Sequence, residues 1–339
     1  MNRRSFIQHT AVAGAIFSAS PLAFSSRSVA RELEAPFDIA LSQWAFNKGI
    51  FGDSRDNEKW FRATLRSDPE KVLRGEMDPR DVVVVARKMG IHAVDLVNNM
   101  WFGHRDDKPW LRDFKQQAEN EGVSFICLMC DVFEHIGVKS KTDRQKSIDQ
   151  HSYWLEAAAE LGCTQMRINP YGEGSYLEQL RQCAEGLHEM SERAQRLGIQ
   201  LVVENHGHPA SNGAWLAMLV EMTAHENFGV YLDFDNFFMG GWGIEPQRRY
   251  DRRQGILDLA SHTVGVSAKT RRFLGNGEEE FIDYDWCVRT LLEHGFKGYM
   301  CAEYAGDQFS ELEGSTKTVN LLRTLQEKYE GFSLQQPGG

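Results

Sequence analysis

The sequence predicts an α/β fold, a single (β/α)8 TIM barrel, from two observations. Short apolar runs alternate with helix-like stretches eight times along the 339 residues, and from the second run onward the runs start 29 to 40 residues apart. A hydrophobic content of 42% is enough for one large core, and the body of the chain contains no apolar run of membrane-spanning length.

The barrel strands follow from the positions of the apolar runs. They are expected to begin near Phe37, Ile91, Val123, Cys163, Ile199, Phe228, Thr263 and Gly298. Helices are expected in the intervals, for example over residues 144–161 and 177–197, where apolar residues recur at helical spacing. One domain should span residues 34–332, followed by a flexible tail at 333–339.

The first interval is longer than the others, because residues 47–79 precede the helix expected at 80–89. On a barrel this insertion is a βα loop over the catalytic face, where long loops act as lids or specificity elements. Its aromatic residues Trp60 and Phe61 either cap the pocket or pack within the loop.

The N-terminus has the features of an export signal. Two arginines in "NRRSFIQ" precede a weakly apolar stretch at 11–17 and the small residues "SVA" at 28–30. This segment resembles the twin-arginine translocation signal, with Arg3, Arg4 and Phe6 at the matching positions. We expect residues 1–30 to be cleaved after export of the folded protein to the periplasm; the alternative is a disordered basic tail.

The charge argues against a nucleic-acid-binding protein, and the cysteine positions argue against a disulfide-stabilised or cysteine-metal protein. Removal of residues 1–30, which carry three arginines and no acids, would change the net charge from −10 to −13, and such a surface repels nucleic acid. The six cysteines are scattered through apolar segments, and "CLMC" at 127–130 is the only CxxC pair. Buried thiols are therefore favoured over disulfides or a cysteine metal site.

Polar residues cluster where the predicted strands end, which is the catalytic face of a barrel. Trp44 or Phe46 after the first strand could stack on a sugar ring. The other strand ends contain "DLVNN" (95–99), Asp131, "RINP" (167–170), "ENH" (204–206), "LDFDN" (232–236), "VSAKTRR" (266–272) and "AEY" (302–304).

Three acids should meet at this mouth, namely Glu204, Asp233 and Glu303. His206 is two residues from Glu204 and therefore shares its side of the strand. Converging carboxylates repel one another unless a cation lies between them, which favours a divalent metal. The alternative is a structural cluster held by arginine.

The chain resembles the sugar isomerase/epimerase superfamily with the xylose-isomerase-like TIM barrel, to which endonuclease IV and its AP endonuclease relatives also belong. The motifs that carry this resemblance occur in the family's order and cover most of the chain after residue 40: "LSQWAF", "LGCTQMRINP", "VVENHG", "GVYLDFDNF", "VSAKT" and "CAEY". The resemblance implies that Glu204, Asp233 and Glu303 bind Mn, Mg, Co or Zn, and that the two glutamates shuttle a proton beside a substrate carbonyl.

Strand seven departs from the family pattern, because Ser267 occupies the position of the usual histidine ligand. Water or His206 would then complete the metal site, or the site binds metal weakly or not at all. Lys269 either stabilises an enolate or pairs with Asp233 or Asp235. Arg271 and Arg272 either grip a carboxylate or phosphate or are solvated. Expected substrate contacts are Trp44, Phe46, Asn169, His206, Asn236, Lys269 and Arg271.

The predicted function is that of a periplasmic isomerase/epimerase-like enzyme, which uses metal-assisted proton abstraction next to a carbonyl of a non-phosphorylated carbohydrate. Glu204, Glu303 and Lys269 are its candidate catalytic residues. Two alternatives stay open: a lyase that eliminates from an oxidised keto glycoside, and a non-catalytic carbohydrate-binding barrel. A homo-oligomer is compatible with the resemblance, whereas DNA repair conflicts with the acidic charge and the missing histidine.

Overall fold

The computed structural model describes residues 35–132, 134–240 and 245–332. The predicted signal at 1–30, with Arg3, Arg4 and Phe6, and the predicted tail at 333–339 lie outside these residues. Within the described part of the chain, no helix is both long enough and apolar enough to cross a membrane.

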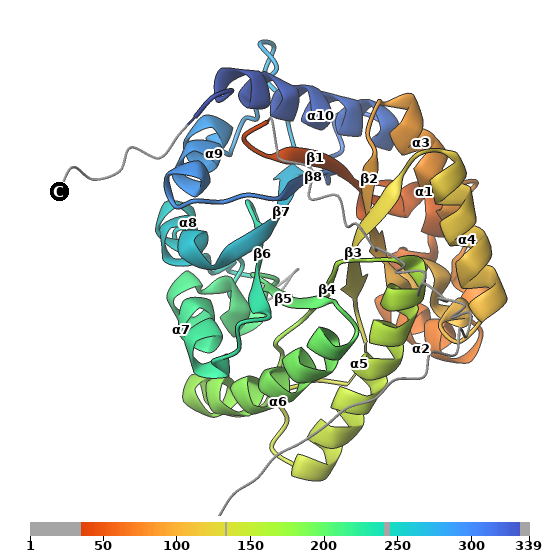
Figure 1. The fold of residues 1–339 in the computed structure, drawn as a ribbon, viewed down its shortest axis with the longest axis vertical. Coiled ribbons are helices and arrows are strands. Elements are labelled where there is room, and N and C mark those ends of the chain that lie inside the picture. Colours follow the sequence, from red (N-terminus) through yellow and green to blue (C-terminus); the bar gives the residue numbers. More distant parts are fainter. Residues whose placement is uncertain (1–34, 133, 241–244, 333–339) are drawn as a thin grey trace, which may run out of the picture. The chain divides into compact units, whose positions relative to one another are not determined.

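Eight parallel strands close into a barrel in which each strand pairs with its neighbours in the sequence (Figure 1). Every predicted strand start lies within two residues of the observed one, so the predicted TIM barrel is confirmed. The strands are β1 (Asp38–Ser42), β2 (Ala93–Val97), β3 (Ser124–Cys130), β4 (Gln165–Ile168), β5 (Gln200–Glu204), β6 (Phe228–Asp233), β7 (Thr263–Thr270) and β8 (Tyr299–Tyr304).

The outer layer consists of helices that follow the strands around the barrel (Figure 1). Most begin at an Asn, Asp or Ser whose side chain accepts a backbone N–H of the first turn; Ser175 and Glu178 form a complete capping box. These helices are α3 (Val82–Lys88), α4 (Lys108–Asn120), α5 (Lys141–Leu161), α6 (Tyr176–Arg196), α7 (Gly213–Thr223), α8 (Arg252–Leu259), α9 (Tyr284–Glu293) and α10 (Glu311–Lys328).

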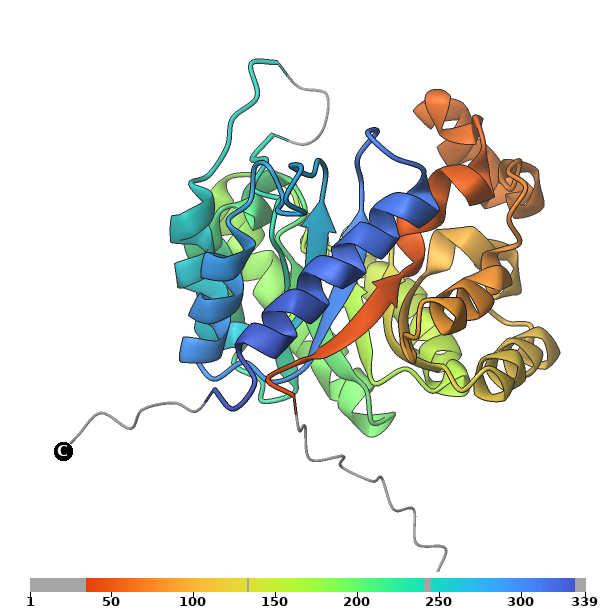
Figure 2. The same ribbon diagram turned by 90° about the horizontal axis from the view of Figure 1, so that it is seen from above.

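The insertion after β1 folds into short helices, chiefly α1 (Asn47–Phe51) and α2 (Glu58–Ser67). Figure 2 shows them on the side to which the strand arrows point, so the insertion covers the expected catalytic face. Phe61 packs edge-on against Phe51 with ring centroids 5.1 Å apart. Gly75 allows the end of the insertion to pass close to the backbone of α1, because a Cβ at this position would lie 1.8 Å from the Gly49 carbonyl oxygen.

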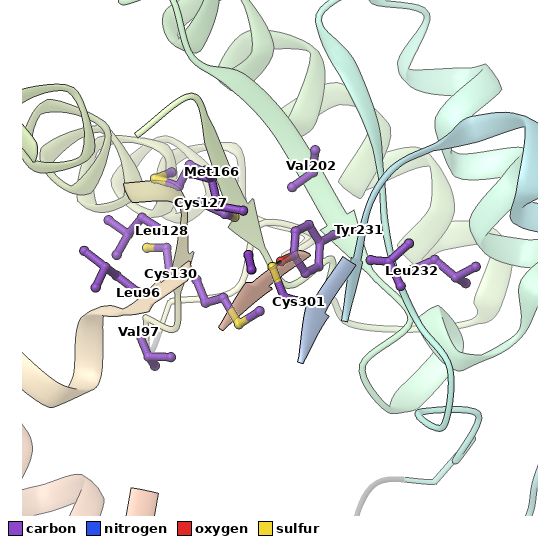
Figure 3. Close-up of a cluster of buried hydrophobic side chains, with 14 of the residues drawn as sticks. Leu96, Val97, Cys127, Leu128, Cys130, Met166, Val202, Tyr231, Leu232 and Cys301 are labelled. Carbon is purple, nitrogen blue, oxygen red and sulfur yellow. Dashed lines mark hydrogen bonds between the residues drawn. The ribbon is translucent and has the colours of Figure 1, made fainter. Parts of the chain in front are cut away.

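The barrel interior contains a polar group within an apolar core (Figure 3). The Tyr231 hydroxyl donates to Asp95 Oδ2 at 2.9 Å and also contacts Cys301 Sγ at 2.7 Å. Burial is the main cause that raises the pKa of Asp95 to about 7. All six cysteines are buried free thiols, as the sequence predicted.

Replacement of Asp95 by Asn should change how stability depends on pH. The pKa of Asp95 in the folded protein lies above the value of about 3.9 expected in the unfolded chain, so this group's contribution declines as pH rises from about 4 to about 7. Asp95→Asn should remove a slope of up to about 1.4 kcal/mol per pH unit. Urea unfolding of both proteins between pH 4.5 and 8 measures it, and equal slopes would contradict the assignment.

Candidate active site at the barrel mouth

The three predicted acids meet at the carboxyl ends of the strands. Glu204 ends β5, Asp233 ends β6, and Glu303 lies near the end of β8, with exposures of 2%, 0% and 3%. Strand register brings their partners from β7 to the same level, because Asp233 pairs with Ser267 and Glu303 pairs with Lys269. The barrel therefore gathers three buried carboxyl groups around one strand.

Lys269 lies among these acids. Its Nζ is 2.8 Å from Asp233 Oδ2 and 3.0 Å from Glu303 Oε1, and it donates to Asn236 Oδ1 at 3.3 Å. The other Asp233 oxygen accepts the backbone N–H groups of residues 235 and 236, which fixes the carboxylate. The Lys269 ammonium thus supplies the cation that the converging acids require.

Glu204 has a different cation. Arg167 Nε lies 2.9 Å from Glu204 Oε2, and its Nη1 donates to Asp131 Oδ1 at 2.6 Å. Asn169 also donates to Asp131, and Asn236 donates to Glu204 Oε1 at 2.9 Å. Arg167 therefore connects Glu204 to Asp131.

These contacts argue against the predicted metal centre. Among the residues that the structure describes, no group of three or more His, Cys, Asp or Glu side chains is arranged to hold a metal ion. A dication between Asp233 and Glu303 would have to displace the Lys269 ammonium, and Glu204 is already paired with Arg167. The donor set expected from Glu204, Asp233 and Glu303 does not fit the ion in this arrangement.

The two residues expected to complete the metal site have other partners. Ser267 donates its hydroxyl proton to Glu303 Oε2 at 2.9 Å. The His206 ring nitrogen Nδ1 lies 2.9 Å from the Tyr171 hydroxyl. Burial first, and then the nearby Arg167, lower the pKa of His206 well below its ordinary value, so this ring is neutral.

Burial raises the pKa values of two of the carboxyl groups, Glu204 and Asp233, whereas nearby cations oppose this effect. At Glu204 the opposing cation is Arg167. Burial lowers the pKa of Lys269, but Asp233 and Glu303 outweigh it and hold that pKa above its ordinary value. Burial is likewise overcome at Asp131, where Arg167 lowers the pKa to about 2. Lys269 therefore stays a cation, and burial shifts the pKa of Glu204 toward the protonated form.

A cavity of about 780 Å³ opens above these groups. Glu204, Lys269 and Glu303 line it, and so do four other predicted residues, Trp44, Asn169, His206 and Arg271. Arg271 is paired with Asp235 through its Nε atom.

Two predicted substrate contacts lie elsewhere. Phe46 is 3% exposed and belongs to the hydrophobic core, because the chain turns helical directly after β1. Asn236 is completely buried and bridges Glu204 and Lys269. Neither is among the described residues that line the cavity, so these two expectations are corrected.

The sequence interpretation missed several cavity residues. Arg167 and Asp131 were visible at strand ends but were not selected. Phe61 lines the cavity, as one reading of the insertion expected, and Arg55 and Arg62 accompany it. Arginines in a loop have no periodicity or motif that marks them as site residues, so no sequence signal identified them.

The fold is a closed barrel, and acids, an arginine and a lysine surround a cavity at its strand ends. The protein is therefore a TIM-barrel protein with a charged site at the carboxyl face of the barrel. The sequence model of one such family, the xylose isomerase-like TIM barrel, matches residues 83–325. The chain belongs to this family.

Solved structures share the fold at low sequence identity. A sugar phosphate isomerase/epimerase from Parabacteroides distasonis is 15% identical, with 85% of this chain and 94% of that chain covered and a TM-score of 0.59. The 3-keto-D-glucoside 4-epimerase from E. coli is 15% identical over 72% and 94% of the two chains, with a TM-score of 0.55.

The IolI protein, solved with a bound zinc atom, is 14% identical over 86% of this chain and 99% of that chain, with a TM-score of 0.58. These likenesses show the fold alone. No curated protein matches the sequence.

Removal of the lysine charge should destabilise the protein. Lys269→Met leaves Asp233 and Glu303 buried without their ammonium partner, which should lower the free energy of unfolding by about 3–5 kcal/mol at neutral pH. The loss should shrink at acidic pH, where the carboxyl groups take up protons. The matched control is Lys328→Met, whose exposed pair with Asp285 should contribute about 1 kcal/mol or less. Similar losses in the two variants would contradict a buried ion-pair role.

Proposed function

We propose that this chain is a carbohydrate isomerase or epimerase that moves a proton next to a substrate carbonyl. The observation that carries the proposal is the pair of buried glutamates, Glu204 and Glu303, that line one cavity together with the Lys269 ammonium. Membership of the xylose isomerase-like family supports the class, and so do the names of the structural neighbours, which include a sugar phosphate isomerase/epimerase and a keto-glucoside epimerase.

The proposed reaction uses the two glutamates in opposite roles. Glu303 takes the proton from the carbon beside the carbonyl, and the C–H electron pair forms an enolate. Glu204, whose burial favours the protonated form, returns a proton to carbon. Return to the same carbon from the other face gives an epimer. Return to the former carbonyl carbon, together with transfer of the neighbouring hydroxyl proton to the former carbonyl oxygen, gives an isomer. Exchange with solvent then restores Glu204 and Glu303.

Lys269 provides the electrostatic stabilisation in this proposal. Lys269 lines the cavity, and Asp233 holds its ammonium in place at 2.8 Å. A fixed cation lowers the energy of the negative charge that develops on the enolate oxygen. Because Lys269 meets this need and the acids do not fit a dication, the proposed mechanism contains no metal-dependent step.

An elimination reaction is the second candidate. The same enolate expels a leaving group from the β-carbon of a keto glycoside, and this outcome needs an acid near the departing oxygen. Tyr171 and His206 line the cavity, and the Tyr171 hydroxyl, which donates to the His206 backbone carbonyl, is the candidate acid for that step, although burial raises its pKa above the ordinary value. Analysis of products separates elimination, which releases an aglycone or sugar, from epimerisation, which does not.

The location proposed for this activity is the periplasm. It depends on Arg3, Arg4 and Phe6, which resemble the twin-arginine signal. Cell fractionation of a strain that expresses Arg3→Lys/Arg4→Lys protein beside wild type reports whether export needs the pair.

The proton-transfer proposal predicts hydrogen exchange at carbon without added metal. Incubation with a panel of ketoses, keto glycosides and ketouronates in D2O and chelator should give deuterium incorporation, detected by NMR. Glu204→Gln and Glu303→Gln should each slow the incorporation by about 100-fold or more.

Glu185→Gln is the control and should exchange at the wild-type rate, because this exposed glutamate of α6 pairs with the buried Arg144 and is not among the described residues that line the cavity. Wild-type protein that binds members of the panel without exchange would support the carbohydrate-binding alternative instead. Exchange that survives both active-site variants would overturn the assigned roles.

A further inference from the structure

The insertion contributes to the cavity a cation that the proposed chemistry does not use. Arg55, in the short helical turn Ser54–Asp56, lines the cavity together with Phe61 and Arg62. Its guanidinium carbon lies 4.6 Å from the centroid of the Trp44 ring and 5.5 Å from that of Phe61. Two aromatic rings therefore hold this guanidinium by cation–π contacts.

The ion pair of Arg55 is longer than those of the cavity cations Arg167 and Lys269. Its Nη2 is 3.9 Å from Glu58 Oε2, and Arg62 contacts the same carboxylate at 3.7 Å. Arg167 and Lys269 have carboxylate partners at 2.6 to 3.0 Å. The carboxylate partner of Arg55 is therefore more distant than those of Arg167 and Lys269.

Partial burial makes the charge of Arg55 costly unless a ligand compensates it. Burial lowers the pKa of Arg55, and Glu58 and Asp131 only partly offset the effect. Arginine nevertheless stays protonated in proteins, so a guanidinium is present at neutral pH. A planar guanidinium with several N–H donors matches the paired oxygens of a carboxylate or a phosphate ester.

We propose that Arg55 binds an anionic substituent of the substrate, a carboxylate or a phosphate ester, at a position away from the reacting carbon. This inference rests on the proposed function, because it names the substrate class of the same site. Trp44 is then a positioning residue for Arg55, since its ring holds the guanidinium at the cavity wall.

The test measures binding, so that its outcome is independent of turnover. D-glucuronate, D-glucose 6-phosphate and D-glucose are titrated calorimetrically into wild-type protein, Arg55→Gln and Arg74→Gln. Arg74 is the matched control, because it belongs to the same insertion, stacks on Trp60 at 4.2 Å and pairs with Asp53, but is not among the described residues that line the cavity.

Wild-type protein and Arg74→Gln should bind at least one anionic probe about 10-fold or more tightly than D-glucose, which corresponds to about 1.4 kcal/mol. Arg55→Gln should lose this preference and keep its affinity for D-glucose. Preference for glucuronate identifies a carboxylate, and preference for the sugar phosphate identifies a phosphate ester.

Equal affinity of the wild type for all three probes, or a preference that persists in Arg55→Gln, would overturn the inference, and so would failure of every probe to bind. The proposed function is tested separately by deuterium incorporation. A preference for anionic probes without deuterium incorporation would support the Arg55 subsite and contradict the proposed enzyme activity. Deuterium incorporation without a preference for anionic probes would support the enzyme activity and contradict the Arg55 subsite.

Discussion

The contact on which the rest of the site depends is that of the Lys269 ammonium with Asp233 and Glu303. Burial of several carboxyl groups at one barrel mouth is unfavourable without a nearby cation. Lys269 supplies that cation at 2.8 and 3.0 Å, and the register of β7 against β6 and β8 fixes its position. The barrel thus provides both the acids and the charge that makes their burial tolerable.

Hydrogen bonds connect Lys269 and Glu303 to the neighbouring polar side chains of the site. Ser267 donates to Glu303, while Asn236 accepts from Lys269 and donates to Glu204. Arg167 completes the set on the side of Glu204 and ties that residue to Asp131. Glu204 and Glu303 consequently have different partners, and this difference gives two chemically similar side chains separate roles in proton transfer.

The fold could be predicted from the sequence because a short apolar run followed by a helix-like stretch recurs eight times along the chain. The end of each strand then indicated Glu204, Asp233, Lys269 and Glu303 as neighbours. The choice between an enolate-stabilising lysine and a paired lysine could not be made, because it depends on ångström-scale distances after folding. Ser267 indicated only that the nitrogen ligand of the family is missing, and it did not show which group would take the place of the metal. Arg55 could not be identified as a cavity residue, because no periodicity in the sequence indicates how the insertion folds over the barrel mouth.

An internal lysine cation takes the position in which a dication was expected. The most direct measurement is elemental mass spectrometry of chelator-treated protein after incubation with Mn, Mg, Co and Zn and removal of free ions, with Glu204→Gln and Glu303→Gln beside wild type. We expect metal far below one ion per chain in all three proteins. About one ion per wild-type chain, lost in both variants, would contradict this expectation and would restore a carboxylate metal centre.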